Sequence, residues 1–142
     1  MVGYVDEVVI PYDRDLGPVL FDHYGLDTAR RIAEQSPHDV LEIAAGTGIV
    51  TRHLRNLLAK DTRLTAIDIS DSMMELARTK FLPDEQITFQ NADATSLPFI
   101  DEAFDAVVCQ FGIMFFDQAT AFREVHRVLK RKGRYLFRVW DS

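Results

Sequence analysis

Short apolar runs alternate along this chain with longer segments in which apolar residues recur at helical spacing. The apolar runs lie at residues 40–43, 64–68, 87–89, 106–109 and 135–140, and we expect each to form a β-strand. Between them, the spacing predicts helices around residues 50–58, from about residue 71, and from about 118 to 130. This rhythm predicts an α/β fold, in which helices cover both faces of a parallel sheet.

The first 37 residues precede the first clear strand. Helical spacing there is interrupted near Gly25 and predicts two helices, the second ending before Pro37, on Leu16, Leu20, Tyr24, Ala29, Ile32 and Ala33. We therefore expect an N-terminal helical segment over residues 1–37 and a separate core over residues 38–142.

Composition narrows the class of protein. A chain of 142 residues with 47% hydrophobic side chains is typical of one folded domain. The net charge of −6 argues against nucleic acid as the main partner, because phosphate binding needs a basic face. Cys109 is the only cysteine, and no apolar run approaches the ~20 residues that span a bilayer. We expect a cytoplasmic protein that binds neither nucleic acid nor membrane.

Acidic residues stand at the ends of three successive predicted strands. Glu42 lies in the first strand, just before a turn that contains Gly46 and Gly48. Asp68 ends the second strand, and Asp93 follows the third. Because the carboxyl ends of parallel strands meet at one edge of a sheet, we expect these carboxylates to share a nucleotide-like ligand.

Each feature also has a simpler structural interpretation. The glycines are consistent with an ordinary strand-to-helix turn, Asp68 with a helix N-cap, and Asp93 with an Asp turn. Their combination favours a binding site in which the three carboxylates contact the amine, the ribose and the base in order.

A nicotinamide-dinucleotide site is the main rival. Its fingerprint, G-x-G-x-x-G or G-x-G-x-x-A, would need glycine or alanine at position 51 if it began at Gly46, and that residue is Thr51. Begun at Ala44, it would lack the first glycine and would place Ile49 at the last glycine position. The fingerprint therefore does not fit.

Four ordered segments resemble the motifs of class I S-adenosylmethionine-dependent methyltransferases, in the branch that includes ubiquinone-biosynthesis enzymes. They are residues 40–48, 64–77, 91–105 and 122–134, so the resemblance spans about residues 38–140. Ala44 stands where that family usually has its first glycine, and Arg131-Lys132-Gly133 replaces a Pro-Gly-Gly-like turn.

The resemblance implies a Rossmann-like sheet with five strands in the order 3-2-1-4-5, preceded by N-terminal helices. It implies S-adenosyl-L-methionine as the cofactor, with Glu42 toward the methionine amino group, Asp68 on the ribose hydroxyls and Asp93 on the adenine amine. The implied cofactor-binding residues are Glu42, Ala44, Ala45, Gly46, Gly48, Asp68, Ile69, Met73, Asp93, Ala94, Gln110 and Phe111. Tyr12, Phe21 and Tyr24 are candidate lid aromatics, for which simple core packing is an equal alternative.

The function expected from the resemblance is methyl transfer to a small-molecule acceptor. The alternative is a non-catalytic S-adenosylmethionine-binding or interaction module derived from the same fold. No catalytic residue is identified, because only an acceptor that must lose a proton needs a general base, and no Cys/His cluster suggests a metal.

The family's last two strands are absent from this chain, which leaves the fifth strand as an open apolar edge at residues 135–140. Either the chain is truncated, or this edge pairs with a second copy of the chain or with another protein. We favour truncation with some self-association, which would give a homo-oligomer. The residues that face the substrate in this family often lie in the absent part, so the sequence does not specify the acceptor.

Overall fold

The computed structural model describes residues 4–11, 17–110 and 117–141, with side chains described at residues 21–110 and 117–138. The elements, in chain order, are β1 (Tyr4–Pro11), α1 (Gly17–Ala33), β2 (Asp39–Ile43), α2 (Ile49–Leu57), β3 (Arg63–Asp68), α3 (Asp71–Arg78), a 3₁₀ turn η1 (Pro83–Glu85), β4 (Ile87–Asn91), β5 (Phe104–Gln110), α4 (Gln118–Val128) and β6 (Leu129–Asp141).

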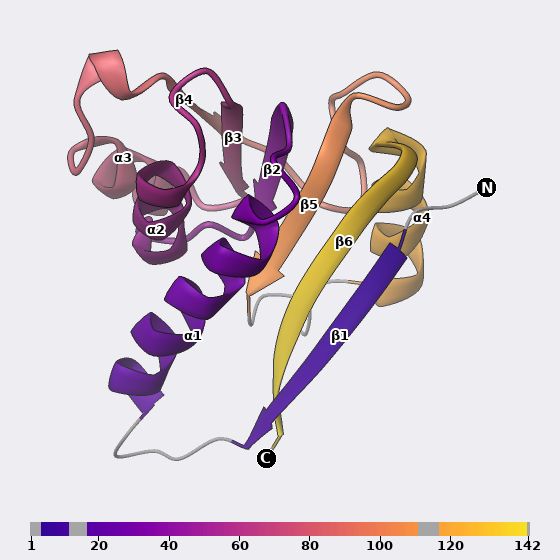
Figure 1. Ribbon diagram of the computed structural model, residues 1–142, viewed down its shortest axis with the longest axis horizontal. Coiled ribbons are helices and arrows are strands. Elements are labelled where there is room, and N and C mark those ends of the chain that lie inside the picture. The colour runs from indigo at the N-terminus through magenta and orange to yellow at the C-terminus, as the bar shows by residue number, and fades with distance from the viewer. Residues whose placement is uncertain (1–3, 12–16, 111–116, 142) are drawn as a thin grey trace.

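One parallel sheet runs through the molecule in the order β1-β6-β5-β2-β3-β4 (Figure 1). Strands β2 to β6 are the five strands expected from the sequence, and their order confirms the predicted 3-2-1-4-5 arrangement. Strand β2 sits in the middle of these five, and all of its residues are buried. A central strand is covered on both faces, so that even Asp39 and Glu42 of this strand are buried.

The helices lie on both faces of the sheet, as expected. On one face, buried residues of α1 and α2, such as Ala29 and Leu54, pack against strand residues such as Val40 and Val108. Helix α3 covers β3 next to them. On the other face, α4 packs through residues such as Val125 (Figure 1). The two cores share no residue because successive strand side chains point to opposite faces.

Residues Tyr4–Pro11 form a strand, not part of a helical lid. They pair in parallel with β6, from Tyr4 opposite Arg134 to Pro11 opposite Asp141. The segment YVDEVVIP is rich in β-branched residues, which favour extended backbone. The expectation that the fifth strand is an open edge is therefore wrong, and so is the basis for self-association through that edge.

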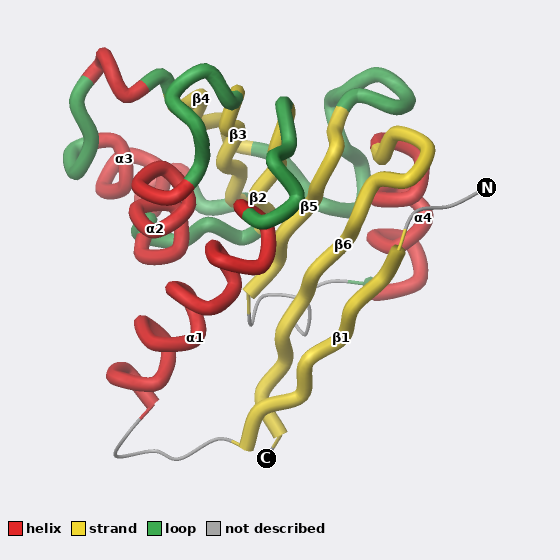
Figure 2. Tube along the Cα trace, in the orientation of Figure 1, coloured by secondary structure: helices red, strands yellow, loops and turns green. Residues whose placement is uncertain are grey.

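The N-terminal helix also differs from the expectation. Helix α1 runs unbroken through Gly25, where the sequence predicted a break between two helices (Figure 2). Gly25 is buried, and a Cβ atom built there would lie 3.2 Å from Cγ2 of Val50 in α2. The glycine thus permits a close helix–helix approach, which a search for helix breakers cannot distinguish from an interruption.

Helix α3 begins at Asp71, as expected, and Ser70 caps it, since the Ser70 hydroxyl accepts from the Met73 backbone N–H at 3.3 Å. The boundary between α4 and β6 lies two residues earlier than expected. Helix α4 ends at Val128, and β6 begins at once with Leu129, which pairs with Phe104 of β5.

Candidate functional site

The loop after β2 bends through three residues with left-handed backbone angles. Ala44, Gly46 and Gly48 have φ of +56°, +58° and +91°, and the Gly48 N–H donates to the Ala45 carbonyl at 3.1 Å. Ala44 thus adopts the conformation that explains the family's usual glycine at that position, and its methyl group is accommodated there. The loop leads directly into α2, so the backbone N–H groups of the first helical turn lie next to it.

Asp68 connects this loop to the end of β3. One carboxylate oxygen accepts from the Gly46 backbone N–H at 2.9 Å, and the other accepts from the Ser70 backbone N–H at 2.9 Å. A carboxylate has about four acceptor positions, so one on each oxygen is left for a further donor. A vicinal pair of hydroxyls matches two such acceptors.

The loop after β4 joins the same network. The Ala92 N–H donates to the Asp68 carbonyl at 3.1 Å, and the Asn91 side chain donates to the Ile69 carbonyl at 2.7 Å. Asp93 follows directly and is exposed; its Oδ1 accepts from the backbone N–H and the hydroxyl of Thr95. These two hydrogen bonds, the backbone one first, lower the pKa of Asp93, so the residue forms an ionised Asp turn.

Glu42 is buried beneath the loop. Its side chain is 2% exposed, and it accepts a hydrogen bond from the hydroxyl of Thr51 in the first turn of α2. Burial raises the pKa of Glu42 to about 8; the negative charge of Asp68 adds to this and the Thr51 hydrogen bond opposes it. Glu42 is therefore a neutral acid near pH 7, poised to ionise if a cation lies against it.

The apolar residues of the expected site fall into two groups. Ile69 is 70% exposed and Met73 is 42% exposed, so both leave apolar surface uncovered beside Asp68. Ala45 and Ala94 are buried, at 7% and 5% exposed, and they can meet a ligand only through their backbone. An uncovered isoleucine side chain beside the Asp68 carboxylate is suited to packing against an apolar part of a ligand.

Gln110 lies at the end of β5, as expected, but its amide is engaged by α1. Its Oε1 accepts from the Thr28 hydroxyl at 2.7 Å, and its Nε2 donates to the Phe21 carbonyl at 2.9 Å. Phe111 and Tyr12 lie outside the described residues. The structure thus connects the loops after β2, β3 and β4, while Gln110 belongs to a separate group of contacts under α1.

Two residues were not singled out from the sequence, one beneath the glycine loop and one in the group of contacts under α1. Thr51 lies nine positions after Glu42, in the first turn of the following helix, and had served only to reject the dinucleotide fingerprint. Arg138 is 1% exposed on β6. The sequence marked this residue only by its charge within the otherwise apolar run of residues 135–140.

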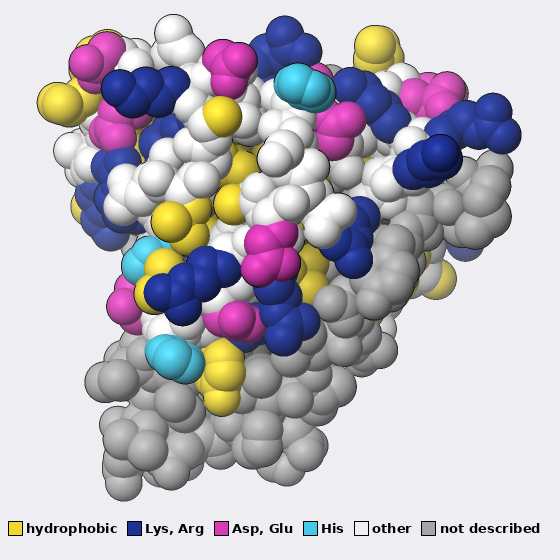
Figure 3. Space-filling view, viewed as in Figure 1, with side chains coloured by type: hydrophobic (Ala, Val, Ile, Leu, Met, Phe, Trp, Pro, Cys, Tyr) yellow, Lys and Arg dark blue, Asp and Glu magenta, His cyan; other side chains and the backbone are white. Residues whose placement is uncertain are grey.

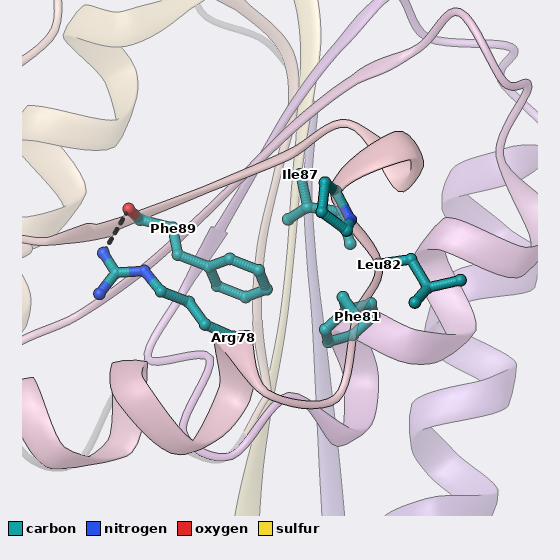
Figure 4. A pocket seen from close by; sticks show the side chains of 6 residues that line it. Arg78, Phe81, Leu82, Ile87 and Phe89 are labelled. Atoms are coloured by element: carbon teal, nitrogen blue, oxygen red, sulfur yellow. Dashed lines mark hydrogen bonds between the residues drawn. The ribbon is translucent and has the colours of Figure 1, made fainter.

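A cavity of about 250 Å³ lies elsewhere, between α3, η1 and the first half of β4 (Figure 4). Arg78 donates from Nη2 to the Phe89 carbonyl at 2.9 Å, and the Phe81 and Phe89 rings lie 5.4 Å apart. The cavity contains none of the expected site residues, so we do not include it in the site.

Among the described residues, no group of three or more His, Cys, Asp or Glu side chains could hold a metal ion. Cys109 is buried in the structure. The face drawn in Figure 3 mixes basic and acidic side chains and shows no single-sign surface. No helix in the described part of the chain combines the length and apolar character that a bilayer crossing requires.

Comparison with known proteins identifies the domain. The model of a family described as a methyltransferase domain matches residues 41–137. The chain is 41% identical over 118 residues to a demethylmenaquinone methyltransferase of Thermotoga maritima, covering 78% of this chain and 50% of that protein. It is 38% identical over 101 residues to the ubiquinone/menaquinone biosynthesis C-methyltransferase UbiE of Hahella chejuensis, covering 68% and 41%. The chain spans about half the length of the relatives that it matches.

Solved structures of similar proteins share the fold of this chain. A putative S-adenosyl-L-methionine-dependent methyltransferase from Methanococcus maripaludis superposes with a TM-score of 0.75 at 26% identity, covering 87% of this chain and 59% of that one. The YcgJ protein from Bacillus subtilis superposes with a TM-score of 0.71 at 34% identity, covering 80% and 50%.

Proposed function

Since this chain belongs to the methyltransferase domain family, we propose that it supports methyl transfer from S-adenosyl-L-methionine to a small-molecule acceptor of the quinone class. The observation that carries the proposal is the position of Asp68. Its carboxylate holds the glycine loop through Gly46, its carbonyl holds the loop after β4, and each of its two side-chain oxygens keeps an acceptor position.

The residues present fit the cofactor. Asp68 would accept from the two ribose hydroxyls, Ile69 would pack against the adenine, and Asp93 would accept from the adenine amine. Glu42 would face the methionine amino group, because a buried carboxyl with a raised pKa is stabilised by a neighbouring cation. When bound, the cofactor supplies an electrophilic methyl group on a sulfonium. The protein's contribution is to align the two reactants and exclude water, which supplies up to about 7–11 kcal/mol in favourable cases.

The acceptor class follows from the relatives' names, which include demethylmenaquinone methyltransferase and a C-methyltransferase. Transfer to carbon breaks the bond between sulfur and the methyl carbon, forms a carbon–carbon bond and displaces a proton from the ring. The attacking ring must be electron-rich, so we propose that the acceptor is the reduced, hydroquinone form. We assign no general base.

Asp68→Asn tests the site. The variant keeps the shape of the side chain but loses the charge and one acceptor oxygen, and we expect its affinity for S-adenosylhomocysteine, the demethylated form of the cofactor, to fall about tenfold or more, from loss of about 1–3 kcal/mol of hydrogen bonding. Titration calorimetry measures the affinity, and circular dichroism checks that the variant is folded. Asp71→Asn, which alters an exposed carboxylate in the first turn of α3, is the matched control. Equal affinity of wild type and Asp68→Asn would remove Asp68 from the site.

Turnover separates the enzyme from the non-catalytic alternative, which nothing in the described contacts favours. We expect S-adenosylhomocysteine to form when the chain is given S-adenosylmethionine and reduced demethylmenaquinone, as followed by mass spectrometry. Binding of the cofactor without its conversion would support the non-catalytic module. The cytoplasmic location and the division of the chain at residue 37 stay predictions.

A further inference from the structure

Arg138 is a buried cation at the carboxyl-terminal part of β6. Its guanidinium donates from Nη2 to Asp27 of α1, and its Cζ lies 5.2 Å from the centroid of the Tyr24 ring. Burial alone would raise the pKa of Asp27, but the hydrogen bond and charge of Arg138, with help from Arg31, outweigh it and lower that pKa. Burying a charge costs several kcal/mol unless it is paired, so this position would not hold arginine for packing alone.

Gln110 is the neighbour of Arg138 across the sheet, because the two residues are paired in the β5–β6 register. Its amide holds Thr28 and the Phe21 carbonyl of the same helix. Two adjacent strand positions therefore hold four positions of α1, namely Phe21, Tyr24, Asp27 and Thr28. Their spacing of three or four residues places them on one face of the helix.

This polar attachment is confined to the middle of α1. The fully buried apolar residues that anchor the helix in the core, Ala29 and Ile32, belong to its last turns, and the half-buried Phe21 packs against the same core from the first half of the helix. Gly25 lies on the same face, since a Cβ built there would be in ordinary van der Waals contact with Nε2 of Gln110, at 3.5 Å. The Nε atom of Arg138 has no hydrogen-bond partner among the described residues. Because an unpaired buried donor costs stability, this arrangement is better explained by the position in which it holds α1 than by hydrogen bonding alone.

These contacts hold α1 at the end of the sheet where β5 and β6 finish. If Asp68 and Asp93 hold the nucleoside at the ends of β3 and β4, the ends of β5 and β6 are left for the acceptor. The first turns of α1 lie at this same end of the sheet, toward which the strand arrows point (Figure 1). Phe21 packs in part against the core and Tyr24 lies beside the Arg138 guanidinium, and the uncovered parts of these two half-buried rings would present flat apolar surface there.

We propose that Arg138 and Gln110 are positioning residues that hold the Phe21–Tyr24 face of α1 as a wall of the acceptor site, suited to a flat aromatic acceptor. The inference rests on the proposed function, because it assigns the wall to the acceptor of that reaction. Arg138 itself acts through α1.

Arg138→Met tests the inference, with Arg30→Met, an exposed arginine of the same helix, as the matched control. Binding of a reduced short-chain demethylmenaquinone, measured with S-adenosylhomocysteine present, does not depend on turnover. We expect Arg138→Met to weaken acceptor binding about tenfold, as for loss of a well-oriented contact surface, and to leave S-adenosylhomocysteine affinity within about twofold of wild type. Amide hydrogen exchange at residues 21–28 should accelerate, while exchange at 29–33 should not. Arg138→Lys, which keeps the charge for Asp27, should recover part of the acceptor affinity.

Several outcomes would overturn the inference. Equal acceptor affinity in wild type and Arg138→Met would show that the position of α1 does not matter to the acceptor. Equal losses of acceptor and cofactor affinity would show a general structural role. Should Arg138→Met fail to fold, Asp27→Asn removes the same ion pair from its more exposed side and is subject to the same criteria. Failure of the proposed function is separate, since it appears in the wild type as absent cofactor binding or absent turnover.

Discussion

Replacing Glu42 by glutamine should change how the stability of the protein depends on pH. The carboxyl is 2% exposed, and its pKa rises from an ordinary 4.5 to about 8 on folding, mainly through burial. Below pH 4.5 the group is protonated in both states and affects stability little. Between pH 4.5 and 8 the unfolded chain releases this proton while the folded chain retains it, so the free energy of unfolding falls as pH rises.

The magnitude follows from the two pKa values. At about 1.4 kcal/mol for each tenfold difference in proton affinity, the interval between 4.5 and about 8 corresponds to about 5 kcal/mol at full ionisation. Glutamine is neutral throughout and keeps the oxygen that accepts from the Thr51 hydroxyl. The variant should therefore be close to wild type in stability near pH 5 and increasingly more stable above it.

Urea unfolding at pH 5.5, 7.0 and 8.5 measures this difference. Because every other titrating group is common to both proteins, the difference between variant and wild type isolates Glu42. Glu75→Gln, an exposed carboxyl on α3, controls for loss of one acidic group and should not reproduce the trend. A difference between Glu42→Gln and wild type that stays constant across the three pH values, or shrinks as pH rises, would refute the argument that burial keeps Glu42 neutral.

Two further predictions concern the same loop and the first part of β6. If the cofactor's amino group lies against Glu42, binding of S-adenosylhomocysteine at pH 7 should release about one proton in the wild type and fewer in Glu42→Gln, as measured by calorimetry in buffers of different ionisation enthalpy; equal proton release would separate Glu42 from the ligand. Gly133→Ala should destabilise the protein by about 1–3 kcal/mol, because the added Cβ would lie 2.8 Å from both the Leu129 side chain and the Lys130 carbonyl. The urea midpoint measures this loss, with the adjacent exposed Lys132→Ala as control, and an unchanged midpoint would show that this part of β6 relaxes freely.

The strands and the acidic positions at their ends were predictable because they depend on short stretches of sequence. Runs such as residues 106–109 specify a strand covered on both faces by composition alone, and parallel strands bring their carboxyl ends to one edge. The link between Asp68 and the glycine loop follows from that geometry, and the structure adds that Asp68 binds the Gly46 N–H itself.

The structure of the N-terminal part could not be predicted from local sequence. Glycine in a helical pattern has two meanings, a break or a close approach, and only the position of Val50 on α2 decides that Gly25 is the second. Strand β1 also depends on a partner that is distant in the sequence. A short β-branched segment becomes a strand only when a partner edge exists, and that edge belongs to β6 at the far end of the sequence.

By itself, the sequence determined the alternation of strands and helices, the turn after β2 and the carboxylates at the strand ends, since each depends on residues within a few positions of one another. The tertiary structure alone decided the neutral state of Glu42, the attachment of α1 by Gln110 and Arg138, and the covering of β6 by β1. These depend on burial and on contacts between residues up to 130 positions apart, such as Tyr4 and Arg134, which no local pattern encodes.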